Sequence, residues 1–167
     1  LQNFSVSAQE AAPESLFFKT DGTKMYVLGS SGDDVNEYDL SVAWDISTAS
    51  YLQRFSVIAQ DIVPSGLSFK PDGTKMYVVG SSTDALYEYD LSVAWDISTA
   101  LWRAPSQDTL DVRSQETEPT GVSFKPDGTK MYVVGDADDD IDEYDLSTAW
   151  DITSASYLQT NTLDGTG

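Results

Sequence analysis

The sequence is built from a near-literal internal repeat. Three segments, beginning at Pro13, Pro64 and Pro119, align without gaps over about thirty residues and share the runs DGTKMYV, EYDLS and AWDI. Neighbouring segments start 51 and 55 residues apart, and the four extra residues fall between Leu101 and Glu118. Such a chain folds into like units that stack, because one unit of this size cannot bury its apolar faces alone.

Each unit has the pattern of four short strands. In the second unit Leu67 and Phe69 alternate with polar neighbours, and the Asp72-Gly73 pair that follows predicts a tight hairpin turn. The run MYVV at 76–79 is apolar at consecutive positions, which favours a strand covered on both faces. A third strand is predicted over 86–91, and a fourth over 51–57 in the first unit. Since no segment carries a sustained helical period, the predicted fold class is all-β.

Four-stranded antiparallel sheets that repeat about every fifty residues are typical of the blades of a β-propeller. We predict blades over 13–63, 64–118 and 119–167. Residues 1–12 are predicted to be the outer strand and connection of a preceding blade, because Leu1–Gln9 matches Leu52–Gln60. Together these segments form part of one propeller, and the chain is expected to be a piece of a longer protein.

The run PDGTKMYVVG, followed some ten residues later by EYDLS, resembles the YVTN-type propeller repeat. The longer form, with AWDIS, SYLQ and FSV elements, is similar to the amplified propeller repeats of surface and virion proteins in marine bacteria and their phages. The resemblance implies a propeller fold and a location outside the cell, at the cell surface or in a virion. YVTN-like propellers include surface-layer modules, binding scaffolds and some enzymes, so the resemblance alone does not fix the function.

Composition narrows the chemistry that the chain can perform. Its 167 residues include 28 acidic and 9 basic side chains, and the formal net charge of −19 repels phosphate backbones and anionic lipids. We therefore expect no nucleic-acid partner and no membrane insertion. The chain has no His and no Cys, so imidazole bases, thiol nucleophiles and zinc-thiolate sites are excluded within it.

Three blades do not close a ring, because propellers typically use four to eight. The predicted partners are further blades from the same longer chain, or a second copy of this chain that completes a six-bladed ring. Without either, each chain would expose two apolar blade faces. The isolated chain is therefore not expected to persist as a monomer.

Because successive strands of a blade run in opposite directions, the loops of each blade lie on two opposite rims of the propeller, and the charged residues divide between these rims. Loops between the first two strands of each blade lie on one rim, and they carry all six lysines: Lys19, Lys24, Lys70, Lys75, Lys125 and Lys130. Loops between the second and third strands lie on the opposite rim, together with the connections between blades. We call this opposite rim the acidic rim, and it carries Glu10, Glu14, Asp33, Asp34, Asp61, Asp84, Glu116, Glu118, Asp136, Asp138, Asp139 and Asp140.

The acidic rim is a candidate ligand surface for calcium or for a glycan. Asp136, Asp138 and Asp140 have the spacing of the start of an EF-hand loop, although Ile141 and Ser147 stand where that loop needs Gly and Glu. Further candidate ligand residues are Asp33, Asp34, Asp84, Glu116, Glu118, Asp139 and Trp102. The alternative is a solvated acidic loop region that keeps the protein soluble. Trp102 occurs only once, in the stretch from Leu101 to Glu118 where the second unit departs from the repeat, which we call the variable stretch. A repacked outer strand explains Trp102 equally well.

Residues that recur in every unit are predicted to be structural. Trp44, Trp95 and Trp150 are expected to pack between blades. The Asp that follows each Trp is expected to cap a turn by accepting bonds from backbone amides. The Gly after each hairpin Asp is expected to take a positive φ. On that ground Gly73→Val should destabilise the blade more than Gly73→Asn, because Asn tolerates the left-handed region.

These features together favour a non-enzymatic module, a structural or adhesive scaffold of an extracellular or virion-associated protein. Residues repeated in every blade are poor candidates for a single active site, so the prediction is that the chain is not an enzyme. The alternative is a propeller hydrolase or lactonase that uses acidic-rim carboxylates with a divalent metal.

Overall fold

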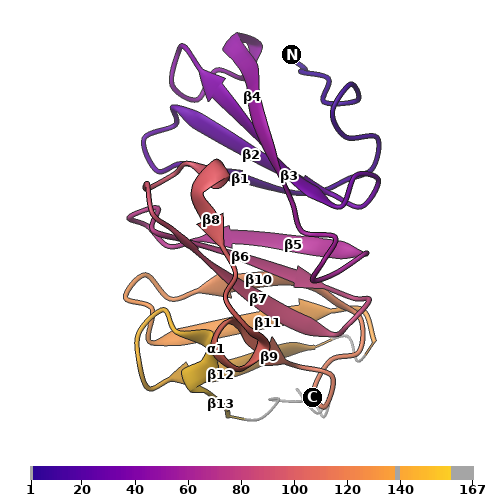
Figure 1. Cartoon of the computed structure of the whole chain (residues 1–167), viewed down its shortest axis with the longest axis vertical. Helices are drawn as coiled ribbons and strands as arrows, with labels where there is room; N and C mark the ends of the chain where they lie inside the picture. The colour runs from indigo at the N-terminus through magenta and orange to yellow at the C-terminus, as the bar shows by residue number, and fades with distance from the viewer. Residues whose placement is uncertain (1, 138–139, 159–167) are drawn as a thin grey trace, which may run out of the picture.

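The computed structural model describes residues 2–137 and 140–158, and it consists of three antiparallel sheets stacked along the long axis of the molecule (Figure 1). The all-β fold class is therefore confirmed. The first blade contains β1 (Pro13–Phe18), β2 (Lys24–Gly29), β3 (Asp34–Leu40) and β4 (Ala49–Ser56). The second contains β5 (Pro64–Phe69), β6 (Lys75–Gly80), β7 (Ala85–Leu91), β8 (Ala100–Leu101) and β9 (Thr109–Asp111). The third contains β10 (Pro119–Phe124), β11 (Lys130–Gly135), β12 (Ile141–Leu146) and β13 (Ala155–Tyr157).

Helical segments are short and lie between strands. Each blade has one 3-10 turn before its outer strand, namely η1 (Ile46–Thr48), η2 (Ile97–Thr99) and η3 (Ile152–Ser154). The single-turn helix α1 (Pro105–Asp108) lies in the variable stretch of the second blade. The predicted Asp caps are confirmed, because Asp96 accepts bonds from Ser98 N at 3.0 Å and from Ser98 Oγ at 2.7 Å. In the part of the chain that the structure describes, no helix could span a lipid bilayer.

The variable stretch splits the outer strand of the second blade in two. β8 pairs with Asp90 and Leu91 of β7, whereas β9 pairs with the other end of β7. Trp102 lies between β8 and α1 on the outer edge of this blade, where its indole N–H donates to Thr109 Oγ1 at 3.2 Å. This position favours the interpretation that Trp102 packs in a rearranged outer strand over the interpretation that it contacts a ligand at the acidic rim.

Adjacent blades are joined by an apolar interface that several polar contacts cross, two of which recur at both interfaces. Tyr77 on β6 is fully buried, its ring centroid lies 4.4 Å from that of Phe124, and its hydroxyl donates to the Trp150 carbonyl at 2.8 Å. Glu88 on β7 accepts a bond from Ile152 N at 3.1 Å. The same pair of contacts joins the first blade to the second, since Tyr26 bonds to the Trp95 carbonyl and Glu37 to Ile97 N. The repeat therefore encodes its own blade interface.

We expect Tyr77→Phe to lower the free energy of unfolding by about 1 kcal/mol, because it removes one buried hydrogen bond and leaves the Trp150 carbonyl without a donor. Chemical denaturation measures this loss. Tyr132 has the same repeat position in the third blade, and no acceptor for its hydroxyl is recorded among the described residues. Tyr132→Phe should therefore leave stability unchanged in dilute solution. Equal losses in both variants would contradict the assigned role of the Tyr77 hydroxyl.

The three hairpin glycines take positive φ as predicted, with Gly73 at +75°. A second constraint was not predicted: the indole of Trp95 lies directly over Gly73, so a Cβ there would lie 2.3 Å from Trp95 Nε1. Trp95 itself has a φ of +66°, and its N–H donates to the Gly73 carbonyl at 2.9 Å. The expectation that Gly73→Asn is mild is therefore wrong, because Asn also carries a Cβ.

Trp95 and Trp150 are buried between blades, which confirms the packing prediction for these two residues. Trp44, at the same position in the first blade, is 59% exposed, because no preceding blade covers it within the described chain. The N-terminal segment, predicted as an outer strand, forms no ladder over residues 2–6. Its natural ladder partner would be the third strand of a preceding blade.

Candidate functional site

The acidic rim is less open than the sequence suggested. Glu10, Asp61 and Glu116 have equivalent positions in the connections that lead into each blade, and all three are buried. Asp61 shows their role: it accepts bonds from Val63 N at 2.7 Å, from Thr83 N at 3.0 Å and from Thr83 Oγ1 at 2.7 Å. These carboxylates tie the inter-blade connection to the neighbouring strand-to-strand loop. The interpretation of Glu116 as a surface ligand residue is therefore corrected.

Each of these carboxylates lies over a glycine at the end of the second strand. A Cβ on Gly80 would lie 2.2 Å from the Asp61 carboxyl carbon, and Gly29 and Gly135 stand in the same relation to Glu10 and Glu116. The glycine is thus needed for the close approach of a buried side chain, not for a positive φ. Sequence reasoning missed this pairing, because carboxylate and glycine lie about twenty residues apart in the chain.

The other candidate rim residues are spread over the blades. Asp33 and Asp84 are half-buried and occupy equivalent turn positions with φ of 49° and 53°, Glu118 and Asp136 are exposed, and Asp140 is half-buried. Asp138 and Asp139 lie outside the described residues, so the predicted EF-hand-like trio is only partly covered. Within residues 2–137 and 140–158, no three acidic side chains gather closely enough to hold a metal ion. The predicted calcium site stays a prediction.

One polar cluster at this rim, in the first blade, has no counterpart in the second, which has Ala85 and Tyr87 at the positions of Asp34 and Asn36. Asp34 on β3 is buried, accepts a bond from Asn36 Nδ2 at 2.6 Å, and lies 3.3 Å from Arg54 Nη1 on β4. Asn36 and Arg54, together with Ala8, Gln9 and Tyr51, line a pocket of about 190 Å³. We call it the rim pocket. The sequence predicts that Arg113, near the edge of this rim, is the one basic residue there; this prediction is wrong, because Arg54 lies at the rim as well.

The rim pocket exists because of two differences between the first two blades. At the position of Asn36 the second blade has Tyr87, whose hydroxyl bonds to the Gln60 carbonyl at 2.8 Å and to Thr83 Oγ1 at 2.7 Å. The first blade has the shorter Asn, and it has Gly32 in place of Thr83. The space that a tyrosine ring fills in the second blade is therefore open in the first. Alignment of the repeats would have revealed the Asn36 difference, although not the pocket.

The chemical groups at the rim pocket suit a polar ligand. Burial raises the pKa of the Asp34 carboxyl above its usual range, although the bonds from Asn36 and Arg54 act in the opposite direction. The Asn36 Oδ1 atom is buried and has no partner among the described residues. An unpaired buried acceptor costs free energy, and a ligand hydroxyl would satisfy it. The exposed guanidinium of Arg54 adds a cation suited to a carbonyl or anionic oxygen.

Comparisons with known proteins show the fold. No protein family model and no curated protein matches the chain. Among solved structures, a Bacteroides fragilis protein assigned as a 6-phosphogluconolactonase matches with a TM-score of 0.60 and 16% identity, over 88% of this chain and 39% of that one. The Pseudomonas aeruginosa periplasmic gluconolactonase matches with a TM-score of 0.57 and 19% identity, over 89% and 38%. The β-propeller domain of a Myceliophteria thermophila protein matches with a TM-score of 0.57 and 12% identity, over 81% and 40%.

This chain therefore has a β-propeller fold and spans about two-fifths of the length of these structures. The narrower resemblance to the marine bacterial and phage repeats stays an expectation. The prediction that the chain is not an enzyme is contradicted, because two of these neighbours bear the names of lactonases. It rested on the identity of the repeats. That ground was insufficient, since the repeats are not identical: Asn36 and Arg54 line a pocket in the first blade, whereas the second blade has Tyr87 at the position of Asn36.

Proposed function

We propose that this chain belongs to a propeller hydrolase that opens sugar lactones at the rim pocket. The observation that carries the proposal is the rim pocket itself: Asn36, with its unpartnered amide oxygen, and the Arg54 guanidinium line it, and the buried Asp34 carboxylate contacts both of these side chains. The names of two structural neighbours support lactones as the substrate class. All pocket residues come from residues 8–54, so the site does not depend on closure of the ring.

The proposed reaction adds one water across the ring ester bond. Arg54 binds the lactone carbonyl oxygen, on which negative charge develops as water adds to the carbonyl carbon. Asp34, directly behind Asn36 and Arg54, accepts the proton of that water. It returns the proton to the ring oxygen when the C–O bond breaks, so the product is the open hydroxy acid. Asn36 Oδ1 accepts a hydrogen bond from a substrate hydroxyl.

We expect the chain to hydrolyse gluconolactone faster than the buffer does, as measured by acid release in a pH-stat. Asp34→Asn should lower kcat by ~100-fold or more, because the base is lost while the shape is kept. Asn36→Tyr should reduce the rate to background, because the ring that fills this position in the second blade would fill the pocket. Since the ionised carboxylate is the base, the rate should rise as pH rises through the raised pKa of Asp34.

Glu118→Gln is the matched control, because this exposed carboxylate lies on the same rim in another blade and should leave the rate unchanged. Parallel assays with added calcium and with a chelator test the predicted dependence on a divalent metal. Circular dichroism and thermal unfolding confirm that each variant is folded. A wild-type rate equal to the buffer background overturns the proposal, as does a rate that Asp34→Asn leaves unchanged.

A further inference from the structure

The two end faces of the blade stack are uncovered within the described chain. On the third blade, Val134 is 43% exposed, whereas the equivalent Val79 is fully buried against the next blade. Tyr132 and Val134 line a depression of about 290 Å³ on this face, together with Gly121 and Ile141. Glu143 is 36% exposed, whereas the equivalent Glu88 is 2% exposed. This face carries the counterparts of Tyr77, Val79 and Glu88, three residues through which the second blade binds the third.

The opposite end of the stack is the free face of the first blade. It carries the counterparts of the third-blade residues to which the second blade binds. The rings of Phe18 and Trp44 pack with centroids 5.4 Å apart, as Phe124 and Trp150 do at 5.2 Å beneath Tyr77. In the described residues no protein acceptor is recorded for Ile46 N–H, the counterpart of the Ile152 N–H that Glu88 binds. The free face of the first blade therefore has the same groups as the third-blade surface that binds the second blade: an aromatic pair, a Trp carbonyl and an Ile N–H.

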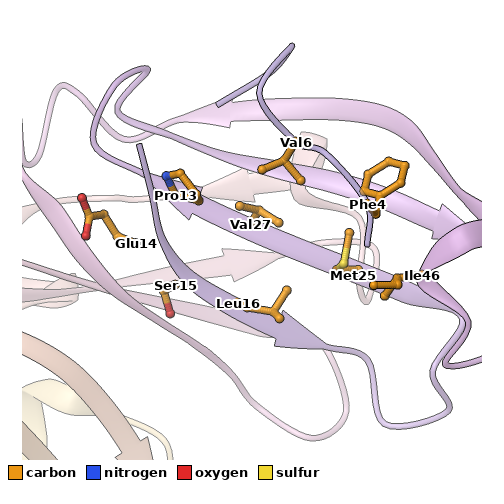
Figure 2. Close-up of a pocket in the computed structure, with 9 residues that line it drawn as sticks. All are labelled: Phe4, Val6, Pro13, Glu14, Ser15, Leu16, Met25, Val27 and Ile46. Carbon is orange, nitrogen blue, oxygen red and sulfur yellow. The ribbon is translucent and has the colours of Figure 1, made fainter. Parts of the chain in front are cut away.

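The N-terminal segment already lies on this free face as part of a preceding blade would. Phe4 packs edge-on against Tyr38 with centroids 5.6 Å apart, as Phe55 packs against Tyr89 at 5.4 Å. Figure 2 shows Phe4 and Val6 over β2, beside an open pocket of about 300 Å³. Leu16, which borders that pocket, is 56% exposed, whereas the equivalent Leu67 is buried. The first blade thus lacks only the body of a preceding blade.

From this complementarity we infer that the third blade of one chain binds the first blade of a second copy, head to tail, through the same contacts that join the blades within the chain. Tyr132 then packs on Phe18 and Trp44 and donates to the Trp44 carbonyl, and Glu143 accepts from Ile46 N–H. A second copy is the occupant that the structure specifies, because both halves of the internal interface stand on this one chain. Such a heterologous contact closes into a ring or continues as an open array. The inference does not depend on the proposed hydrolase function.

Two exposed apolar residues give a decisive test by sedimentation velocity. Leu16→Asp places a charge on the first-blade face, and Val134→Asp places one on the third-blade face. Each variant alone should be monomeric, because a desolvated unpaired charge weakens association by ~100-fold or more. An equimolar mixture should form a one-to-one dimer, because one intact pair of faces remains. Wild-type chain should sediment as a dimer or a larger species.

Val93→Asp is the control, since Val93 is as exposed as Leu16 but lies on the middle blade, and this variant should associate like the wild type. Circular dichroism establishes that the variants are folded. A monomeric wild-type chain at tens of micromolar overturns the inference. So does a mixture that fails to dimerise, and so does either single variant that associates as the wild type does, because that result indicates contact between like faces.

Discussion

Gly73→Asn should destabilise the protein by about 3 kcal/mol, nearly as much as Gly73→Val. The φ of +75° at this position is a conformation that Asn accepts, so conformational strain alone predicts a mild effect. The new Cβ, however, would lie 2.3 Å from Trp95 Nε1, and Trp95 is held between two blades. The indole cannot move without opening the blade interface. Equilibrium denaturation of both variants measures the difference.

The matched control is Gly22→Asn in the first blade. A Cβ on Gly22 would meet Trp44 at 2.4 Å, but Trp44 is largely exposed and its ring can turn toward solvent. In dilute solution this substitution should cost at least about 1 kcal/mol less than Gly73→Asn. If both Asn variants cost the same, the clash with Trp95 is not the cause of the loss.

Asp61→Ala and Gly80→Ala should each destabilise the protein by about 3 kcal/mol, but the double variant should be about as stable as Asp61→Ala alone. Removal of the carboxylate leaves the N–H groups of Val63 and Thr83 without their acceptor. The methyl group that Gly80→Ala introduces collides with that same carboxylate, whose carbon lies 2.2 Å from the ideal Cβ position. Without the carboxylate the methyl group has room, so the double-mutant cycle should show strong coupling.

Gly29→Ala combined with Asp61→Ala is the control for this cycle. Gly29 has the same geometry as Gly80, but the carboxylate over it is Glu10. Here the two losses should add to within about 0.5 kcal/mol. Additive losses for Asp61 and Gly80 would show that carboxylate and glycine are not in contact.

Local pattern was sufficient to predict the strands and the turns. The Asp72-Gly73 pair marks a hairpin wherever it recurs, and the apolar run 76–79 indicates a strand covered on both faces. These signals depend on neighbours in the chain and on side-chain period, so they are visible without coordinates. Repetition added the blade architecture, because like units with two apolar faces have to stack.

The candidate site was only partly accessible to the same reasoning. Asp34 was named as a rim residue, but the partners that give it a chemical role, Asn36 and Arg54, were not. Arg54 follows Asp34 by twenty residues and reaches it only because β3 and β4 pair in a particular register. The sequence analysis predicted that Asp34, Asp61 and Glu116 lie on a solvent-exposed rim. In the structure all three are buried, beneath backbone N–H groups or other side chains.

The sequence by itself determined the all-β class, the four-stranded unit, the hairpin turns and the Asp caps, because each depends on residues close together in the chain. Only the tertiary structure decided that Trp95 covers Gly73, that Asp61 fills the space above Gly80, and that Asn36 leaves a pocket where Tyr87 leaves none. These outcomes depend on which side chains of separate strands and blades share one volume. Close packing fixes that volume only when the blades are assembled, and the linear order of residues does not specify it.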